Sequence, residues 1–468
     1  MRLHWHRQDL RGTDNTALAW AADHGDVLPV FVFDDAVLEH GSSPRVRFML
    51  DALADLRAFY RERGGDLLVR HGDPAVVLPA LCEELDAEGA LWNRDYSGLA
   101  QARDARVKEA LADRDLERQS FHDDIHHEPG SITTNQGEPY SVYTYFWKKW
   151  RDRAKADPYP APESVVDPAD HAVEAGEMPT IEELGFEEPD CNVEPAGYEA
   201  ARERLDAFCE SAVFEYDDRR DYPADRATSK LSAHLRWGTI GVREVYAATE
   251  DATMAAETET ERENVEAFQS QLAWREFYTH VLYFNPEVVS QNYKEYEHGI
   301  RWREDGEELA AWKAGETGYP IVDAGMRQLL AEGYMHNRVR MIVASFLTKD
   351  LLQDWREGYD HFREHLVDHD TANDNGGWQW AASTGTDAQP YFRIFNPMTQ
   401  GERYDPDAEY IREYVPELAD ADPDQIHGWH ELSLPERKAA APDYPNPIVD
   451  HSERREQALA MFEEARGE

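Results

Sequence analysis

The chain has 468 residues and a formal net charge of −46, and both limit the classes of protein to which it can belong. A single hydrophobic core stops growing at roughly 250–300 residues, so at least two domains are expected. Cys82, Cys191 and Cys209 form no Cys-x-x-Cys pair, which argues against an iron–sulfur cluster and for a reduced, cytoplasmic protein. Because no apolar run is long enough to cross a bilayer, we expect a soluble protein without a membrane partner.

The negative charge argues at first against a polyanionic partner, because nucleic-acid binding normally needs a cationic surface that neutralises phosphates. The 94 acidic residues are spread along the chain rather than gathered in one tail, and most of the basic residues are arginine. We interpret this composition as adaptation to salt, as in halophilic microbes. In molar salt the Debye length falls to about 3 Å, so a local basic groove can still bind DNA.

Short β-rich runs alternate with helical patterns through the first part of the chain, which predicts an α/β fold with a parallel, Rossmann-like sheet. The expected strands are 2–5, 27–33, 66–69 and 90–92, and the expected helices between them are 44–63, 74–86 and 99–113. Residues 155–195 are rich in Pro, Asp and Glu without periodicity, and helices dominate from about 200 onward. We therefore expect an α/β domain over 1–130, an interdomain connection over 131–205 and an all-α domain over 206–468.

One helix of the C-terminal part has two distinct faces. Its core face carries Val339, Ile342, Val343, Phe346 and Leu347 at helical spacing. The opposite face carries Asn337, Arg340, Met341, Ala344 and Thr348. A solvated surface is the ordinary interpretation of that second face, but Met341 and Ala344 are poorly suited to solvent, so a ligand floor is the alternative.

Two other segments offer groups that suit phosphates or flat rings. The first comprises Tyr216, Arg220, Thr228, Ser229, Leu231 and Ser232, just before or at the start of a helical pattern. Hydroxyls and free N–H groups there suit a phosphate, although ordinary helix caps look the same. The second is a helical face with Gln271, Trp274, Arg275 and Tyr278. It is suited either to stacking a base and holding a phosphate or to packing in a core.

The most distinctive stretch is 368–380 (DHDTANDNGGWQW), which combines three carboxylates, two glycines and two tryptophans. Glycines let the backbone approach a flat ligand, and polar groups can bind the edge of its ring, although a loop of turn residues has a similar composition. A metal site is the competing chemistry. The histidines that suggest it are His122, His126 and His127, or His365 and His369. Neither set has a third ligand at a diagnostic spacing, so we expect no metal.

These segments together resemble the photolyase/cryptochrome family, and within it the cyclobutane pyrimidine dimer photolyases. The resemblance begins with WHRQDLRGTDNTAL at 5–18 and YSVYTYFWKKW at 140–150. It becomes dense in TSKLSAHLRWG at 228–238, in 315–358 and in NGGWQWAASTGTDAQPYFRIFNP at 375–397. The family pattern implies an α/β domain that can hold an antenna chromophore and a helical domain that holds FAD. It also implies electron transfer from photoexcited FADH⁻ to a dimer flipped out of damaged DNA.

Roles follow from the resemblance, residue by residue. The FAD phosphates and ribityl chain would be surrounded by Tyr216, Thr228, Ser229, Leu231 and Ser232. The flavin ring and its neighbouring groups would meet Arg340, Asp368, Asp370 and Asp374. Electrons would reach the flavin through Trp302, Trp355 and Trp378. The dimer pocket and its DNA-facing rim would comprise Arg220, Gln271, Trp274, Arg275, Asn337, Met341 and Trp380.

Two positions depart from the usual photolyase pattern. Gln271 stands where many dimer photolyases have a glutamate; (6-4) photolyases often have glutamine there, but with histidines in place of Asn337 and Met341 that supply an acid. Asn337 and Met341 supply no such acid, so cyclobutane repair is favoured. Asp374 stands where an asparagine usually faces flavin N5 and where some plant cryptochromes have aspartate. We expect it to be protonated beside an anionic flavin and to donate to N5.

Some alternatives stay open at this point. The antenna chromophore is an 8-hydroxy-5-deazaflavin or a methenyltetrahydrofolate, with the deazaflavin preferred, and residues 33–48 and 91–107 lie where this family binds it. A cryptochrome-type photoreceptor without repair activity is the main rival function. A plain α/β nucleotide-binding enzyme is disfavoured because no Gly-rich fingerprint follows the first strand. We expect a monomer without an obligate protein partner.

Overall fold

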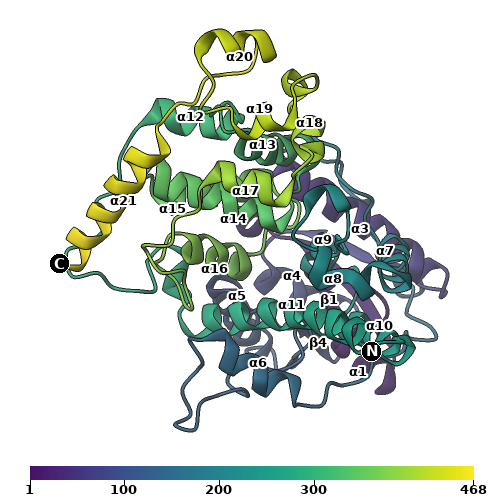
Figure 1. The fold of residues 1–468 in the computed structure, drawn as a ribbon. Helices are drawn as coiled ribbons and strands as arrows, with labels where there is room; N and C mark the ends of the chain where they lie inside the picture. The colour runs from purple at the N-terminus through teal and green to yellow at the C-terminus, as the bar shows by residue number, and fades with distance from the viewer. Residues whose placement is uncertain (468) are drawn as a thin grey trace. The chain divides into compact units, whose positions relative to one another are not determined.

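The computed structural model describes residues 1–467 and divides into two compact units. Unit 1 comprises Met1–Pro189, Val193–Phe214 and Ser229–Pro286, and unit 2 comprises Asp190–Asn192, Glu215–Thr228 and Glu287–Glu468. Figure 1 shows the C-terminal helices α12–α21 in green to yellow. The domain borders near 130 and 205 stay a prediction. Within residues 1–467, no helix has both the length and the apolar character that a membrane span requires.

The sheet of unit 1 is five-stranded and parallel, in the order β3-β2-β1-β4-β5, which confirms the predicted fold class. Its strands are β1 (Arg2–His6), β2 (Val27–Phe33), β3 (Leu68–His71), β4 (Gly89–Asn93) and β5 (Glu117–Phe121). β3 begins two residues later than predicted, and β5 was not predicted at all. The sequence of β5, ERQSF, has no apolar strand pattern, so its pairing with β4 defines it as a strand.

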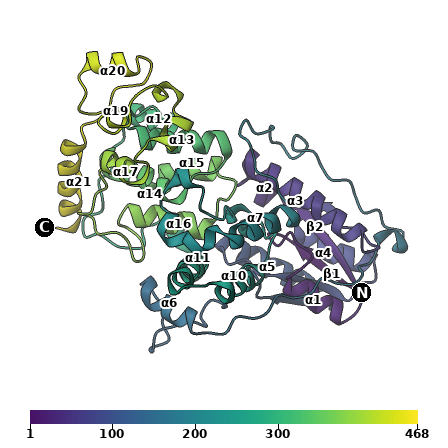
Figure 2. The same ribbon diagram turned by 45° about the vertical axis from the view of Figure 1, so that its right-hand side comes forward.

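Side chains of the sheet alternate between two cores, as a doubly wound sheet requires. Val27, Phe31 and Phe33 of β2 are buried with α1 (Thr16–Asp23) and α3 (Ser43–Arg61). Leu28, Val30 and Val32 are buried with α4 (Pro74–Glu84) and α5 (Gly98–Ala112). Figure 2 shows these helices around the strands.

The acidic segment expected to connect the domains packs on unit 1. Val165, Ile181 and Leu184 are buried in the same core as α3, and the Val166 N–H donates to the Val27 carbonyl at 2.9 Å. The other helices of unit 1 are α2 (Asp35–Leu38), α6 (Tyr143–Arg151), the 3₁₀ turn Pro168–His171, α7 (Tyr198–Glu210), α9 (Ser232–Trp237), α10 (Val242–Ala255) and α11 (Glu259–Phe284).

Unit 2 is helical around one apolar core that contains Trp312, Trp355, Trp378 and Trp429. Its helices are α8 (Tyr216–Arg219), α12 (Gly306–Ala314), α13 (Pro320–Glu332), α14 (Asn337–Ser345), α15 (Trp355–His365), α16 (Thr371–Ala381), α17 (Pro397–Tyr404), α18 (Glu409–Tyr414), α19 (Pro423–His427), α20 (Leu434–Ala440) and α21 (His451–Arg466). Short turns form at Ala212–Glu215, Pro223–Asp225, Pro286–Val289 and Pro416–Leu418, and α14 continues as a π-helix over Phe346–Asp350.

Candidate functional site

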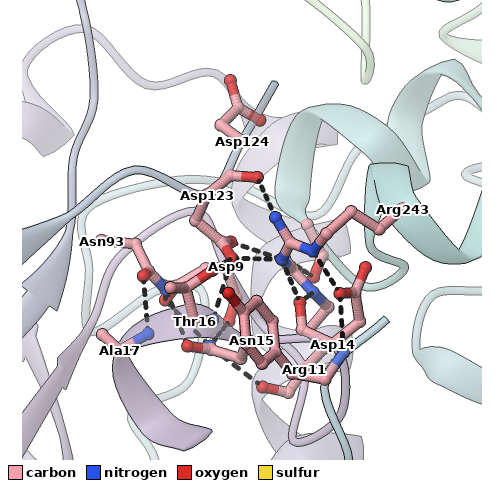
Figure 3. A network of polar contacts seen from close by, with 12 residues as sticks. Asp9, Arg11, Asp14, Asn15, Thr16, Ala17, Asn93, Asp123, Asp124 and Arg243 are labelled. Atoms are coloured by element: carbon pink, nitrogen blue, oxygen red, sulfur yellow. Dashed lines mark hydrogen bonds and ion pairs between the residues drawn. The ribbon is translucent and has the colours of Figure 1, made fainter. Parts of the chain in front are cut away.

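The crevice at the carboxyl ends of β1 and β4 is where a doubly wound sheet usually binds a ligand, because the strand order reverses there. In this chain, a network of polar side chains lies at this end of the sheet (Figure 3). Asn93 donates from Nδ2 to Asp9 Oδ2 at 2.6 Å and to Asn15 Oδ1 at 2.7 Å, and its own Oδ1 accepts from the Ala17 N–H at 3.0 Å. The residues at the switch point therefore satisfy one another.

Charges of the same network are paired as well. Arg243 contacts Asp14 Oδ1 and Asp123 Oδ1, both at 2.5 Å, and Arg11 forms an ion pair with Asp123. Burial raises the pKa of Asp123, but the two guanidiniums outweigh burial and lower that pKa to about 2. All four side chains are at most 5% exposed, so this is a buried ionic network that is internally compensated.

A second polar cluster, in unit 2, joins α14 to the start of α16. Arg340 donates from its Nη2 to Asp368 Oδ2 at 2.7 Å, and its Nη1 lies 3.8 Å from Asp374 Oδ1. Burial opposes the charge of Arg340, but the two carboxylates outweigh it and raise the pKa of the guanidinium. Asp370 caps α16 by accepting from the Asn373 N–H at 2.7 Å. The sequence predicted these carboxylates as one group, and Arg340 contacts two of them.

His369, which the sequence suggested as a possible metal ligand together with His365, is also a member of this cluster. Its Nδ1 lies in a hydrogen bond with Asp374 Oδ2 at 2.6 Å, and the Asp370 N–H donates to the same oxygen at 3.2 Å. Asp374 Oδ2 therefore accepts one backbone hydrogen bond and shares a second with the His369 ring, and the Arg340 guanidinium lies nearby.

Several buried polar atoms of unit 2 have no hydrogen-bond partner in the described residues, and two of them, Asp368 Oδ1 and Trp378 Nε1, belong to this cluster and to α16. Each such atom costs about 1–3 kcal/mol if it stays unsatisfied, so a bound polar group is the natural partner. Trp378 is held in place by Phe362, at 4.9 Å between ring centroids, and by Gly358, where a Cβ would lie 2.0 Å from the Trp378 ring. The donor set fits a flat heteroaromatic ligand with its own N–H and carbonyl groups.

The face of α14 that was predicted as a ligand floor is only partly exposed. Asn337 is exposed and Met341 is half-buried, with the Asn337 amide 3.9 Å from the Met341 sulfur. Ala344 and Thr348 are buried, and the Thr348 hydroxyl donates to the Ala344 carbonyl at 2.8 Å. The solvated-surface interpretation therefore fails for the second half of this face. The predicted core face is confirmed, because all five of its side chains are buried.

The tryptophans proposed as an electron route lie in the core of unit 2 or against it. Trp355 is fully buried and donates from Nε1 to Asn292 Oδ1 at 2.9 Å. Trp302 is partly buried against Phe462, at 6.0 Å between centroids. Trp378 has a further indole neighbour, Trp312, at 6.1 Å. Trp380 packs beside Phe395 at 6.5 Å.

On α11 in unit 1, the predicted face is real, and its residues contact nearby parts of the same unit. Trp274 stacks on Tyr143 with ring centroids 3.6 Å apart. Arg275 donates to the Asp124 carbonyl at 2.7 Å and pairs with its carboxylate at 2.5 Å. The Gln271 amide makes only a long contact of 3.4 Å to the Ala267 carbonyl. The Arg275 guanidinium thus contacts other residues of unit 1, whereas Trp274 and Gln271 stay partly exposed.

The segment predicted to bind phosphate is divided between the units. In unit 2, Tyr216 is buried, which raises its pKa to about 12, and Arg220 pairs with Asp217 at 2.9 Å. In unit 1, α9 begins at Ser232 and has no side-chain cap, while the Leu231 N–H donates to Ser229 Oγ at 3.4 Å. Thr228 is half-buried. The alternative of an ordinary hydroxyl cap on α9 is therefore wrong.

Glu276, whose carboxyl group is fully buried on α11, was not predicted from the sequence as a site residue. It accepts hydrogen bonds from Trp150 Nε1 at 2.9 Å and from the N–H groups of His126 and His127 at 2.9 and 3.0 Å. This arrangement explains the histidines at 126 and 127, which line a loop anchored through their backbone. In the described residues they do not assemble a metal-ligand group.

Two protein-family models match the chain, one in its N-terminal part and one in its C-terminal part. Residues 2–163 match the family model for DNA photolyase, and residues 268–464 match that for the FAD binding domain of DNA photolyase. The chain belongs to the DNA photolyase family. The deoxyribodipyrimidine photo-lyase of Halobacterium salinarum is 64% identical over 480 residues, and the match covers 100% of both chains.

Solved structures of photolyase relatives have the same fold. A bacterial class III photolyase from Agrobacterium tumefaciens matches with a TM-score of 0.91 and 38% identity, over 100% of this chain and 98% of that chain. A cryptochrome from Synechocystis matches with a TM-score of 0.90 and 26% identity, over 98% and 99% of the two chains. The fold is therefore common to photolyases and a cryptochrome, so function depends on the site.

Proposed function

We propose that this chain is a light-driven lyase that repairs cyclobutane pyrimidine dimers in DNA and uses FAD as its cofactor. The observation that carries the proposal is the ion pair of the partly buried Arg340 with the buried Asp368. The Oδ1 atom of Asp368 lacks a partner in the described chain, and both residues lie inside the stretch that matches the FAD binding domain of DNA photolyase. The full-length similarity to a deoxyribodipyrimidine photo-lyase supports the substrate.

When bound, reduced FAD supplies the photoexcited electron that splits the dimer, while the protein supplies position, electrostatics and protection from water. Arg340, Asp368 and Trp378 are the residues that we assign to the flavin ring, because they combine a partly buried cation, an unsatisfied acceptor and an unsatisfied donor. The groups assigned to the phosphates and ribityl chain are Tyr216, Thr228, Ser229, Leu231 and Ser232. The tryptophans assigned to photoreduction are Trp378, Trp355 and Trp302.

Asp374 and His369 form a pair that we assign to proton control at the flavin. We expect a proton on Asp374 when reduced flavin is bound, and the His369 ring, 2.6 Å from Asp374 Oδ2, is the group with which that proton would exchange. Asp374→Asn removes this exchange while it keeps the shape of the side chain. The pH dependence of flavin photoreduction should therefore flatten in Asp374→Asn, and identical profiles in the two proteins would refute the assignment.

The substrate assignment depends on groups that stack and on the absence of a suitable acid. Trp274 and Trp380 are assigned to stacking against the dimer, with Gln271, Asn337 and Met341 at its edges and Arg220 and Arg275 near the rim. Repair of a (6-4) lesion needs an acid at these positions, and Asn337 and Met341 carry no titratable proton. A cyclobutane dimer is therefore the favoured lesion.

The test is repair of an oligonucleotide that carries one cyclobutane thymine dimer, with reduced, FAD-loaded protein at high salt, under blue light and in the dark. We expect restoration of the intact thymines only in the light. Flavin-loaded, folded protein that leaves the dimer intact would overturn the proposal. It would favour the second candidate, a cryptochrome-type photoreceptor, for which Asp374 is the supporting residue.

An antenna chromophore is proposed for unit 1, either an 8-hydroxy-5-deazaflavin or a methenyltetrahydrofolate. Side chains at the carboxyl ends of β1 and β4 already hydrogen-bond one another, and this network restricts where on unit 1 the chromophore can bind. Reconstitution with each chromophore and measurement of energy transfer to FAD would distinguish the two.

A further inference from the structure

Three side chains on the last turns of α15 lie together on one face of that helix. His361, Glu364 and His365 are spaced i, i+3 and i+4, which brings them side by side on a helix. Each offers a ligand atom, and these atoms all lie within 4.8 Å of one another. The spacing His-x-x-Glu-His is short enough for a single ion to contact both rings and the carboxylate.

The two imidazoles lie close together, and one of them lacks a partner. His361 is 6% exposed, and its Nε2 is buried without a hydrogen-bond partner in the described residues. The ring centroids of His361 and His365 are 4.5 Å apart. A buried ring nitrogen without a partner is costly, and a bound ion would supply that partner.

A second group of possible ligands, His4, His6 and Asp9, lies in β1 and the turn after it. Most of its ligand atoms are already hydrogen-bonded within the protein. His6 Nδ1 is 2.9 Å from the Asp9 carbonyl, and His6 Nε2 is 2.7 Å from the Tyr60 hydroxyl. The Asp9 carboxylate accepts from Arg7, Asn15 and Asn93. Since two of its three members are engaged within the protein, this group is part of the unit 1 core.

We propose that His361, Glu364 and His365 form a binding site for a divalent transition metal of the Zn²⁺, Ni²⁺ and Cu²⁺ group. Two nitrogen ligands and one carboxylate oxygen suit these ions and leave one position for water. The half-exposed His365 and the exposed Glu364 give the ion access from solvent, and the buried His361 gains a partner for its ring.

The site lies next to the tryptophans of unit 2. The His361 ring centroid is 5.6 Å from that of Trp312, and Trp312 is 6.1 Å from Trp378. A paramagnetic ion at His361 would therefore quench nearby indole fluorescence, whereas Zn²⁺ would not. This difference supplies a readout that is independent of repair and of the FAD content.

The experiment uses FAD-loaded, tag-free, full-length protein with its thiols alkylated and with excess Mg²⁺ present to saturate weak acidic sites. Zn²⁺ is titrated against a chromophoric chelator, and Cu²⁺ is titrated while tryptophan fluorescence is recorded. We expect one saturable site in the wild type and at least tenfold weaker binding in His365→Gln. Glu364→Gln should weaken binding less, and His298→Gln, which alters an exposed histidine elsewhere in unit 2, should leave it unchanged.

The outcomes can be separated because Glu364 is exposed and His365 is half-exposed, so we expect their substitution to preserve the fold. An increase in the melting temperature with Zn²⁺ in the wild type and in His298→Gln, but not in His365→Gln, would confirm the site. Equal Zn²⁺ affinity in the wild type and His365→Gln, or no saturable site in the wild type, would overturn the proposal.

Discussion

Two largely buried clusters of arginine and aspartate side chains, one in each unit, differ in whether all their buried polar atoms have partners. At the switch point of unit 1, Arg11 and Arg243 are paired with Asp14 and Asp123, and no member has a buried atom without a partner in the described chain. In unit 2, the Arg340 cluster leaves Asp368 Oδ1 unsatisfied. Since a buried polar atom without a partner is costly, the first group is complete as a structural element and the second is complete only with a ligand.

Breaking the structural network should have the largest effect on stability. Asp123→Asn removes the charge that pairs with Arg11 and Arg243, and breaking a buried pair typically costs about 3–5 kcal/mol. We expect a fall of this size in the free energy of unfolding, measured in denaturant at neutral pH. Asp113→Asn, at an exposed helix end, is the matched control and should change stability by less than about 0.5 kcal/mol. Equal losses in both variants would contradict the account.

The same network predicts how stability depends on pH. The pKa of Asp123 is lowered from its ordinary value near 3.8 to about 2, so its contribution is fully present above pH 4 and is lost as the pH falls through 2. The stability difference between wild type and Asp123→Asn should therefore shrink between pH 4 and pH 2. Burial, and to a smaller extent the charge of Asp123, raise the pKa of neighbouring Asp14, which acts in the opposite direction and less strongly in Asp123→Asn. A difference that stays constant to pH 2 would show that the charge of Asp123 is not stabilising.

Filling the space beside Trp378 should have a smaller effect. A Cβ on Gly358 would lie 2.0 Å from the Trp378 ring, whereas a Cβ on Gly377 meets nothing within 4 Å. Gly358→Ala should cost about 1–3 kcal/mol of unfolding free energy and shift the fluorescence of Trp378. Gly377→Ala, also inside a helix, should be neutral or stabilising by up to about 1 kcal/mol. Unchanged stability in Gly358→Ala would show that the indole is not held as described.

The smallest expected effect concerns lesion binding. The Gln271 amide is only weakly engaged within the protein, so Gln271→Glu loses one donor and keeps an acceptor. We expect the affinity for a dimer-containing oligonucleotide to change by less than tenfold, or about 1.4 kcal/mol, with repair retained. Loss of repair in this variant would mean that the donor of Gln271 is needed for the lesion.

The sequence predicted features that depend on local pattern. Strands β1, β2 and β4 and the apolar face of α14 follow from periodicity, and the carboxylates at 368–374 stand out by composition. Strand β5 was missed because its sequence lacks an apolar pattern and its identity comes from pairing. Local spacing did not reveal that His369 contacts Asp374 across the start of α16, or that Glu276 accepts hydrogen bonds from a loop about 150 residues away.

The most direct test of the contrast between the two groups is the FAD content per folded chain in Asp368→Asn and in Asp123→Asn. We expect Asp368→Asn to fold with near-normal circular dichroism but to lose most of its flavin absorbance. The folded fraction of Asp123→Asn should retain FAD in the wild-type ratio despite its lower stability. Full FAD retention in Asp368→Asn, or selective FAD loss in folded Asp123→Asn, would contradict the account.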